Sequence, residues 1–268
     1  MKLTESFQAH YDAGNESHRL SDLSLERLRT ESILRRYLPK GPSVILDVGG
    51  ADGVYAFPLA HQGHEVHLID PVALHIKQAQ SKNKTAIKKV KTVSIGDARE
   101  LLIPDNFADA VLYLGPLYHL IDFEDRRRAI SEAFRVLKPC GIFVAAFISK
   151  FTSMIDGVRA DYFGDPAFRD IVKEDLKNGP HRNPSDHPGY FTDAFFHHPS
   201  DAIKEIGACR FHNLKCLAVE GPIWMISNLG NQLADAGKKK QILDFLEQIE
   251  SDPTLIGASG HFVVVGYK

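Results

Sequence analysis

A glycine-rich stretch, Asp47-Val48-Gly49-Gly50-Ala51-Asp52-Gly53, combines two residue types that suit a ligand-binding loop. Glycines let a backbone turn tightly and approach a ligand closely. The carboxylates of Asp47 and Asp52 would repel a pyrophosphate, whereas they would favour an ammonium or a sulfonium group. The stretch therefore predicts a binding loop for a ligand that carries positive charge.

Two common nucleotide motifs fit this loop poorly. The dinucleotide fingerprint GxGxxG, begun at Gly49, would need glycines at the positions that Ala51 and Val54 occupy. A phosphate-binding P-loop ends in GK[ST], whereas Val54 and Tyr55 follow Gly53. Taken alone, the loop leaves a dehydrogenase or a phosphate-binding protein open.

The loop follows a buried apolar segment and opens a helix, and this alternation repeats along the chain. The expected strands are 44–48, 66–69, 92–95, 110–114 and 142–147, and the expected helices between and around them are 25–38, 54–61, 72–82 and 125–137. Short apolar strands separated by helices predict βαβ units and a parallel sheet that is covered on both faces. Ligands bind such sheets at the carboxyl ends of the strands.

The pattern changes after the fifth expected strand. Residues 151–199 are rich in aromatic, His, Gly and Pro residues, and they predict two short helices and a loop without a further sheet layer. A helix near 200–206, strands near 212–219 and 261–267, and a helix over 237–250 follow. The two closing strands permit an antiparallel edge on the sheet.

At four ordered places the sequence resembles the class I S-adenosylmethionine-dependent methyltransferases. The loop Asp47–Gly53 is similar to the family's [DE]xGxGxG, and Asp70 ends the second strand as the family's acidic residue does. Gly96-Asp97-Ala98 follows the third strand. Phe107-Ala108-Asp109-Ala110-Val111 and Leu137-Lys138-Pro139-Cys140-Gly141 are similar to the family's FDxV strand and LKPGG turn. The resemblance covers roughly residues 40–150.

The resemblance implies a doubly wound, mostly parallel seven-stranded α/β sheet, the Rossmann-like methyltransferase fold, with a helical cap. Residues 1–40 would be an N-terminal helical cap segment. Residues 41–268 would be the methyltransferase domain, with insertions at about 151–199 and 221–256 that complete the cap.

It also implies S-adenosyl-L-methionine as the cofactor, S-adenosyl-L-homocysteine as its product, and a set of contacting residues. These are Asp47, Gly49, Gly50, Ala51, Gly53, Asp70, Pro71, Gly96, Asp97, Ala98, Leu114 and Gly115. Asp47 would orient the loop or the ammonium group, Asp70 would accept hydrogen bonds from both ribose hydroxyls, and Asp97 would accept from the adenine amino group. Asp70→Ala is then expected to weaken binding severely and to leave the fold intact.

Two residues depart from the family's motifs, and three aspartates each have an alternative role. Ala51 stands where the family has its middle glycine, and Cys140 stands where LKPGG has its first. Both side chains are small, so we expect slight adjustment without loss of binding. Asp47 also suits a loop cap, Asp70 a helix N-cap and Asp97 a plain turn, but their order along the chain favours binding.

Methyl transfer from a cationic sulfur needs an aligned nucleophile, so a dedicated base is optional. The candidates for catalysis are Tyr11 in the N-terminal segment, and Tyr118 and His119 after the fourth strand. Tyr118 also suits the lining of an acceptor pocket. Each has a structural alternative: a packed tyrosine for Tyr11, and a hydrogen-bonded structural histidine for His119.

Residues 181–198 hold four histidines and four aromatic residues. This segment predicts a lid over the methyl acceptor, with His187, Tyr190 and Phe191 as candidate substrate contacts. An inert packed insertion and a metal site are the alternatives. The histidine spacing is not typical of zinc, and we expect no metal.

The composition of the chain narrows its partners. Its 268 residues carry 32 basic and 34 acidic side chains, so it lacks the excess of positive charge typical of general nucleic-acid binders. Its three cysteines show no CxxC spacing, and no signal peptide or membrane-spanning stretch is expected. We expect a cytoplasmic monomer or homodimer that acts on a small molecule.

The leading hypothesis is methyl transfer to an O, N or S nucleophile of a small molecule by in-line displacement. Methylation of RNA or protein is an alternative that would use the basic cluster at Lys82, Lys84, Lys88, Lys89 and Lys91. The more ordinary interpretation of that cluster is a solvated helix end and turn. A non-catalytic S-adenosylmethionine-binding module is the second alternative.

Overall fold

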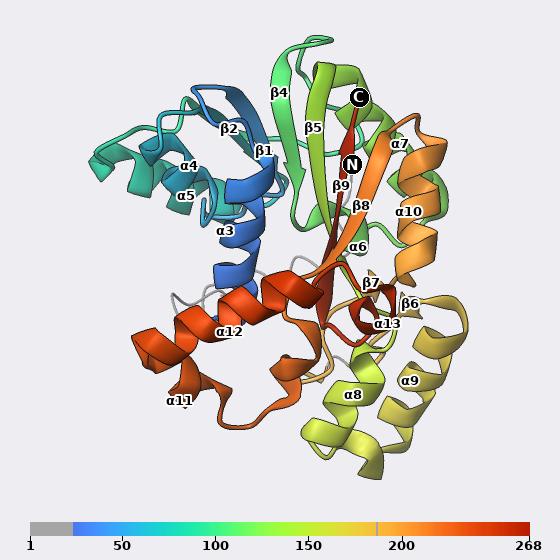
Figure 1. Ribbon diagram of the computed structural model, residues 1–268. Coiled ribbons are helices and arrows are strands. Elements are labelled where there is room, and N and C mark those ends of the chain that lie inside the picture. Colours follow the sequence, from blue (N-terminus) through green and yellow to red (C-terminus); the bar gives the residue numbers. More distant parts are fainter. Residues whose placement is uncertain (1–23, 186) are drawn as a thin grey trace. The chain divides into compact units, whose positions relative to one another are not determined.

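The computed structural model describes residues 24–185 and 187–268, and within them lies a seven-stranded sheet in the order β3-β2-β1-β4-β5-β9-β8 (Figure 1). Its strands are β1 (Val44–Val48), β2 (Glu65–Asp70), β3 (Thr92–Ile95), β4 (Ala108–Tyr113), β5 (Leu137–Ile148), β8 (His212–Ala218) and β9 (His261–Tyr267). The pairings from β3 through β5 are all parallel. The predicted doubly wound, mostly parallel sheet is therefore confirmed.

The strand β9 runs antiparallel to its neighbours. The Ser149 N–H after the end of β5 donates to the carbonyl of Gly260 before β9, and the Cys140 N–H near the start of β5 donates to the carbonyl of Lys268 after it. The Val219 N–H after β8 likewise donates to the carbonyl of His261 at the start of β9. These bonds give the sheet the antiparallel edge that the two closing strands permitted.

Helices flank the strands because the strands are apolar on both faces. The helices α3 (Leu25–Tyr37), α4 (Ala56–His61), α5 (Ala73–Thr85), α6 (Pro116–His119), α7 (Phe123–Val136) and α10 (Pro199–Ala208) accompany the sheet. The helices α4 and α5 pack on β2, and α5 also contacts β3 (Figure 1). Ile45, Leu46, Val111, Leu112 and Phe143 are completely buried, which places the core at the centre of the sheet.

The chain divides into two compact units. One comprises residues 34–146, 203–215 and 264–268, and the other comprises residues up to 33 together with 147–202 and 216–263. The second unit includes residues from the stretches predicted to form a cap, and the predicted boundary at residue 40 stays a prediction. No helix in the described ranges has both the length and the apolar character that a bilayer crossing requires.

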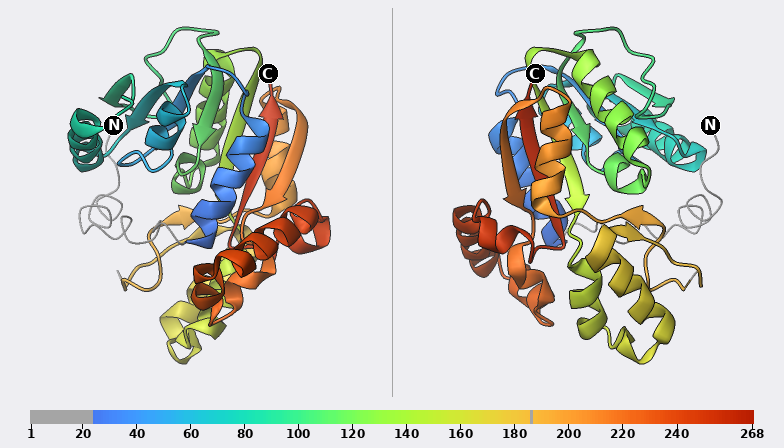
Figure 2. Two further views of the ribbon diagram at one scale, coloured as in Figure 1. Left: turned by 60° about the vertical axis from the view of Figure 1, so that its left-hand side comes forward. Right: turned by 90° about the vertical axis from the view of Figure 1, so that its right-hand side faces the viewer.

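Several short helices of the second unit lie outside the predicted set. They are the 3-10 helices Tyr162–Gly164 and Gly221–Met225, α11 (Leu229–Ala234) and α13 (Pro253–Ile256). The helix α12 (Ala236–Ile249) was expected, and α11 packs beside it (Figure 2). Leu25, Leu233 and Leu246 form the small core under these helices. Elements of three to six residues have too few turns to give a periodic sequence signal.

Residues 151–199 contain the two expected helices, α8 (Thr152–Arg159) and α9 (Pro166–Asn178), which pack against each other (Figure 2). The expectation of a plain loop after them was incomplete. Gly179, with φ +89°, ends α9 in the left-handed conformation. The chain then forms a two-residue antiparallel pair of β6 (Pro180–His181) with β7 (Ala194–Phe195). A pair this short has no alternating pattern that a sequence could reveal.

A buried polar network holds this insertion together. The Asp175 carboxylate accepts from the Ser153 hydroxyl and lies 2.8 Å from His181 Nδ1, while His181 Nε2 lies 2.6 Å from the carbonyl oxygen of Tyr190. Asp175 is fully buried, and His181 is 2% exposed. The network therefore ties α8, α9 and the residues after β6 to one carboxylate.

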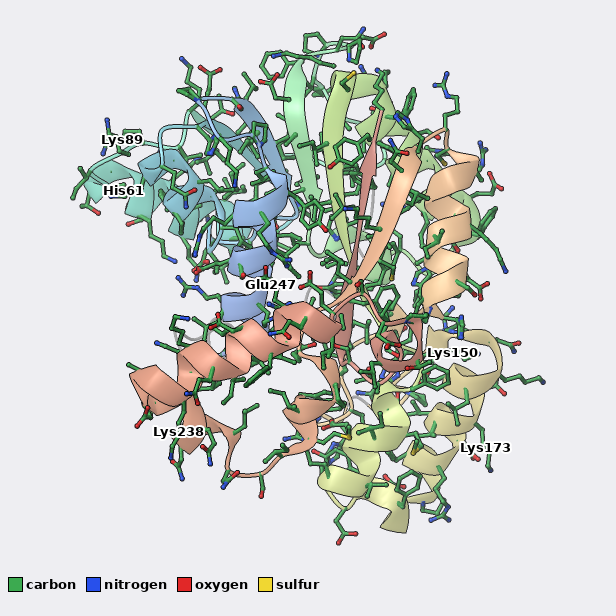
Figure 3. All side chains as sticks on the ribbon, in the orientation of Figure 1. His61, Lys89, Lys150, Lys173, Lys238 and Glu247 are labelled. Atoms are coloured by element: carbon green, nitrogen blue, oxygen red, sulfur yellow. The ribbon has the colours of Figure 1, made fainter. Side chains whose placement is uncertain are left out.

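We expect Asp175→Ala to lower the free energy of unfolding by about 3–5 kcal/mol, because it leaves a buried imidazole and a buried hydroxyl without their acceptor. Asp170→Ala on the same helix is the matched control. Its partner Lys173 projects from α9 into solvent (Figure 3), and the pair is about three-quarters exposed, so the control should change stability by less than about 0.5 kcal/mol. Urea denaturation measures both, and equal losses would contradict the assignment of the network.

Candidate functional site

The carboxyl ends of β1 to β4 bring the predicted cofactor residues to one edge of the sheet. Asp47 in β1 is in register with Leu68 in β2 and with Leu112 in β4. Asp70, the last residue of β2, is in register with Ile95, the last of β3. The loops that leave these strands all belong to one compact unit. The parallel topology thus produces the grouping that separate sequence positions only suggested.

The loop Gly49–Gly53 is packed so tightly that side chains have no room at its glycines. Gly49 has φ +72°, and a Cβ there would lie 2.7 Å from the Pro116 ring. A Cβ at Gly50 would lie 2.7 Å from Asp47 Oδ2, and one at Gly53, with φ +95°, would lie 2.6 Å from the Phe57 ring. These contacts explain why glycine occupies all three positions.

Both departures from the family's glycine pattern keep a glycine-like backbone. Ala51 has φ +48° and Cys140 has φ +64°, so each L residue occupies the left-handed region that glycine enters freely. The Ala51 N–H uses this conformation to donate to Asp70 Oδ2 at 2.9 Å. The slight adjustment that we expected at Ala51 and Cys140 is therefore local backbone strain.

We expect Cys140→Gly to raise the free energy of unfolding by about 0.5–1 kcal/mol. Relief of the left-handed strain, about 1–2 kcal/mol, exceeds the entropy that glycine adds to the unfolded chain. The Cys140 side chain is exposed, so its removal should cost no packing energy. Cys140→Ala, which keeps the Cβ, should leave stability unchanged. Thermal or urea unfolding measures both, and a stabilising alanine would contradict the explanation.

Asp47 is the least compensated charge of the site. It is completely buried, and within residues 24–185 and 187–268 neither carboxylate oxygen forms a hydrogen bond of good geometry, although the nearby Ala56 backbone N–H favours its charged form. Burial, assisted by the nearby Asp70 carboxylate, raises the pKa of Asp47 to about 7. The second loop carboxylate differs, because Asp52 Oδ2 lies 2.6 Å from Lys82 Nζ on α5. A buried carboxylate of this kind is suited to an incoming cation.

Asp70 is held by three donors of the chain. Oδ2 accepts from the Ala51 N–H at 2.9 Å, and Oδ1 accepts from the Val72 N–H at 2.9 Å. His75 Nδ1, on the first turn of α5, lies 3.0 Å from Oδ1. The N-cap residue of α5 is Val72, and this cap has no side-chain hydrogen bond, so Asp70 is not the helix N-cap that we weighed as its alternative role. Its bonds to Val72, His75 and Ala51 fix its carboxylate at the strand end. Pro71 and Val72 follow it directly.

The third strand end is organised around Asp97 and Arg99. The Asp97 carboxylate accepts from the Arg99 backbone N–H, Nε and Nη2 at 2.9–3.0 Å, and Arg99 also pairs with Asp125 of α7. Gly96 is needed here because a Cβ would lie 2.6 Å from Ile69. The carbonyl of Ala98 accepts from the Tyr113 hydroxyl at 3.1 Å, which ties this loop to β4.

The segment after β4 approaches the glycine loop closely. An added Cβ at Gly115 would lie 3.6 Å from both the Gly49 carbonyl oxygen and the Tyr118 hydroxyl. Tyr118 is buried and its hydroxyl donates to the carbonyl of Leu114 at 3.3 Å, while the His119 ring packs against the Tyr118 ring. These contacts give Tyr118 a structural position within the short helix α6.

A buried arginine fixes the far end of the same segment. Arg126 of α7 is 2% exposed and donates to the carbonyls of Leu120 and Ile121. Its Nε and Nη2 also donate to the Glu205 carboxylate at 2.9 and 3.0 Å. Because both ends of the segment from Leu114 to Ile121 are bonded in this way, its backbone is preorganised beside the glycine loop.

Three of the predicted acceptor residues, His187, Tyr190 and Phe191, belong to the other unit. Tyr190 is buried with Phe168, Ile171 and Val172, and its hydroxyl donates to Asp165 at 2.7 Å. His187 is exposed and stacks on Tyr190 with ring centroids 4.0 Å apart, and Phe191 is partly buried. Tyr190 therefore stabilises the insertion through packing. The candidate Tyr11 lies outside the described residues.

Within the described ranges, one group of three side chains has the spacing of metal ligands. Glu26, Glu220 and His261 place their donor atoms within 4.8 Å of one another, and none belongs to the histidine-rich segment 181–198. His261 Nδ1 lies 2.7 Å from Glu220 Oε1, and this imidazole lowers the pKa of the Glu220 carboxyl against the effect of its burial. The His261 backbone N–H also donates to Glu220 Oε2 at 2.8 Å, so Glu220 is held by a partly buried histidine.

Three observations test whether these residues fit the cofactor that the resemblance implies. Asp47 offers an uncompensated buried carboxylate, which suits an ammonium or sulfonium group. The glycine loop approaches Pro116 and Gly115 without intervening side chains. Asp70 and Asp97 each keep acceptor capacity beyond the bonds described, since a carboxylate accepts about four hydrogen bonds. The residues present therefore fit S-adenosylmethionine.

The sequence analysis missed three residues that support this site. His75 holds Asp70, Arg99 holds Asp97, and Arg126 holds the segment after β4. For His75 and Arg99, the sequence shows a basic residue shortly after the acidic residue at a strand end. It pointed equally to a solvated helix turn, so spacing could not have separated these residues from ordinary surface charge.

Comparisons with known proteins agree with the fold. Residues 46–145 match the family model of the methyltransferase domain. The ubiquinone/menaquinone biosynthesis C-methyltransferase UbiE of Rickettsia akari is 30% identical over 165 residues, which are 58% of this chain and 60% of that protein. The corresponding protein of Rickettsia bellii is 28% identical over 171 residues, or 61% and 64% of the two chains. This chain thus spans less than two thirds of the length of these relatives.

Solved structures show the same fold at lower identity. An S-adenosylmethionine-dependent methyltransferase of Archaeoglobus fulgidus superposes with a TM-score of 0.57 at 20% identity, over 96% of this chain and 99% of that one. The phosphoethanolamine N-methyltransferase 2 of Haemonchus contortus, in complex with S-adenosyl-L-methionine, has a TM-score of 0.55 at 15% identity, over 90% and 52%. These structures show the fold, and the family match of residues 46–145 confirms the predicted resemblance.

Proposed function

We propose that this chain, whose residues 46–145 form a class I S-adenosylmethionine-dependent methyltransferase domain, is an enzyme that methylates a small molecule. The observation that carries the proposal is Asp47, a buried and uncompensated carboxylate under a glycine loop at the carboxyl edge of the sheet. A carboxylate in that position is costly unless a cation binds beside it. The part of the chain that matches the family includes this residue.

The chain's own residues divide the work as follows. When bound, the cofactor supplies a methyl group that is already activated on a positively charged sulfur. The Asp47 carboxylate provides negative charge for its cationic end, Asp70 accepts from the ribose and Asp97 accepts from the adenine. The fixed segment from Leu114 to Ile121 lies beside the glycine loop and would exclude water from a bound methyl donor. Positioning of this kind can remove on the order of 7–11 kcal/mol from a barrier.

The acceptor is proposed as a small molecule with an O, N or S nucleophile. The named relatives are C-methyltransferases of ubiquinone/menaquinone biosynthesis, so carbon acceptors belong in the same screen. His119 and Tyr118 are the proposed side chains near the transferred methyl, together with Tyr11. His187, Tyr190 and Phe191 stay proposed acceptor contacts, with Tyr190 acting through packing. The division into a cap segment, 1–40, and a domain, 41–268, also stays a prediction.

Isothermal titration with S-adenosylhomocysteine tests the cofactor site, and no heat of binding with folded protein would refute the proposal. Transfer of a radiolabelled methyl group from S-adenosylmethionine to a fractionated metabolite extract tests the activity. Labelling of one small-molecule fraction is expected. Binding without labelling of any fraction would favour the non-catalytic binding module.

The RNA or protein alternative depends on the basic cluster around the end of α5. Lys82 is paired with Asp52, and Lys89, at the outer end of this region (Figure 3), donates to the carbonyls of Asn83 and Lys84. These contacts favour a capped helix end over a phosphate-binding surface. Filter binding of RNA across salt concentrations tests this, and tight, steeply salt-dependent binding would favour the alternative.

A further inference from the structure

The acceptor capacity of the Asp70 carboxylate is nearly used by the chain itself. An ionised carboxylate accepts about four hydrogen bonds, two on each oxygen. Oδ1 already has two donors, the Val72 N–H at 2.9 Å and His75 Nδ1 at 3.0 Å. Oδ2 has one, the Ala51 N–H at 2.9 Å. With the donors from residues 24–185 and 187–268 counted, one acceptor position is left, and it is on Oδ2.

Two of these three donors cannot leave without changing the backbone. The Ala51 N–H belongs to the glycine loop, where Ala51 already adopts φ +48°. Val72 is the N-terminal cap residue of α5, and its N–H bond to Oδ1 closes the turn that begins the helix. His75 is the only side chain of the three donors. It is 6% exposed on the first turn of α5, so its ring is held in place by packing.

We propose that His75 is a positioning residue that occupies, on Asp70, the place that a second ribose hydroxyl would need. Asp70 then accepts a hydrogen bond from one ribose hydroxyl, on Oδ2, and it recognises the ribose through that single bond. The inference rests on the proposed cofactor. It differs from the expectation from family resemblance, in which Asp70 accepts from both hydroxyls. Since a carboxylate only accepts, Nδ1 of His75 carries the hydrogen of their bond.

The wild-type protein provides the first test, by isothermal titration with S-adenosylhomocysteine and with its 2′-deoxy and 3′-deoxy analogues. Loss of a hydrogen bond to a charged group weakens binding by about tenfold to a hundredfold. We expect one analogue to show such a loss, while the other binds within about threefold of the parent compound. Comparable losses of tenfold or more for both analogues, or losses below threefold for both, would overturn the inference.

Substitution of His75 provides the second test. His75→Phe removes the donor, keeps the ring volume and frees a position on Oδ1, so the tolerated analogue should now also lose about tenfold relative to S-adenosylhomocysteine. His67→Phe is the matched control. His67 is likewise buried, lies on β2 and bonds to Thr92 and Glu65 without contacting Asp70. The His67→Phe variant should therefore discriminate between the two deoxy analogues as the wild type does.

The outcomes separate this inference from the proposed function. Tight binding of S-adenosylhomocysteine with unchanged discrimination in His75→Phe would overturn the role of His75 and leave the cofactor assignment intact. Absence of S-adenosylhomocysteine binding by the folded wild type would instead refute the proposed function. Thermal unfolding verifies each variant, and His75→Leu, which also lacks the donor, replaces His75→Phe if that variant does not fold.

Discussion

Binding of S-adenosylhomocysteine is expected to strengthen about tenfold between pH 6 and pH 8, and to release close to one proton at pH 6. The cause is Asp47, whose pKa burial and the neighbouring Asp70 raise to about 7. Below that pH the carboxyl is neutral in the free protein. An ammonium group bound beside it favours the carboxylate, so the ligand must displace the proton at pH 6 but not at pH 8.

A rise in pH strengthens ligand binding through Asp47, but it has the opposite effect on the stability of the unliganded protein. The folded protein holds this proton more tightly than the unfolded chain does, because the pKa in the folded state is raised. The free energy of unfolding of the unliganded protein should therefore fall as the pH rises from about 4 toward about 7, and a bound cation should restore it. Thermal unfolding over that range, with and without ligand, measures both trends.

Titration in buffers of different ionisation enthalpy gives the number of protons released. Asp47→Asn is the decisive variant, because it removes the titrating group and keeps the volume of the side chain. It should bind with little pH dependence between pH 6 and pH 8 and release no proton. If wild type and Asp47→Asn showed the same pH profile, the uncompensated carboxylate would not be the group that meets the cation.

Asp70→Asn is expected to weaken binding of S-adenosylhomocysteine by about tenfold to a hundredfold, since it turns a charge-assisted acceptor into a neutral amide. Asparagine is the suitable substitution here. The expectation that Asp70→Ala would leave the fold intact needs correction, because alanine would remove the acceptor of two backbone N–H groups and of His75. Each donor left unsatisfied costs about 1–3 kcal/mol.

Asp52→Asn is the matched control for this experiment. Asp52 lies in the same glycine loop, but its carboxylate pairs with Lys82, whose side chain is about half exposed. The control should therefore bind within about threefold of the wild type. Equal losses for both variants would mean that general loop charge, and not the strand-end carboxylate, determines affinity.

The regular elements of the sheet were predictable because their signal is local. The strands β1 and β3 lie at the residues expected, and β2, β4 and β5 differ by a few residues at their ends. The helix α7 begins two residues earlier than expected. There, Asp122 caps it by accepting from the N–H groups of Glu124 and Asp125. Short apolar runs reveal a strand, whereas its first and last residues depend on such caps and on neighbouring strands.

The short elements and the β6–β7 pair could not be predicted in this way. Their stability comes from contacts between distant residues, such as the Phe196 N–H that donates to the carbonyl of Gly179. The role of Tyr190 shows the same limit. Its residue type and position suggested an acceptor contact, which stays a prediction, and the fold adds that its ring packs against Phe168. An aromatic residue in an insertion serves either purpose, and only packing distinguishes them.

The sequence by itself determined the order of the elements, the glycine loop and the three acidic strand ends, Asp47, Asp70 and Asp97. Each follows from residue types within a few positions, which is the range over which sequence patterns act. Only the tertiary structure decided that these three carboxylates differ in the partners that compensate their charge. Among the described residues, Asp47 is buried without a hydrogen-bond partner of good geometry, Asp70 is held by three donors and Asp97 by Arg99. The physical reason is that charge compensation depends on neighbours in space, which parallel strand packing brings from separate loops to one edge.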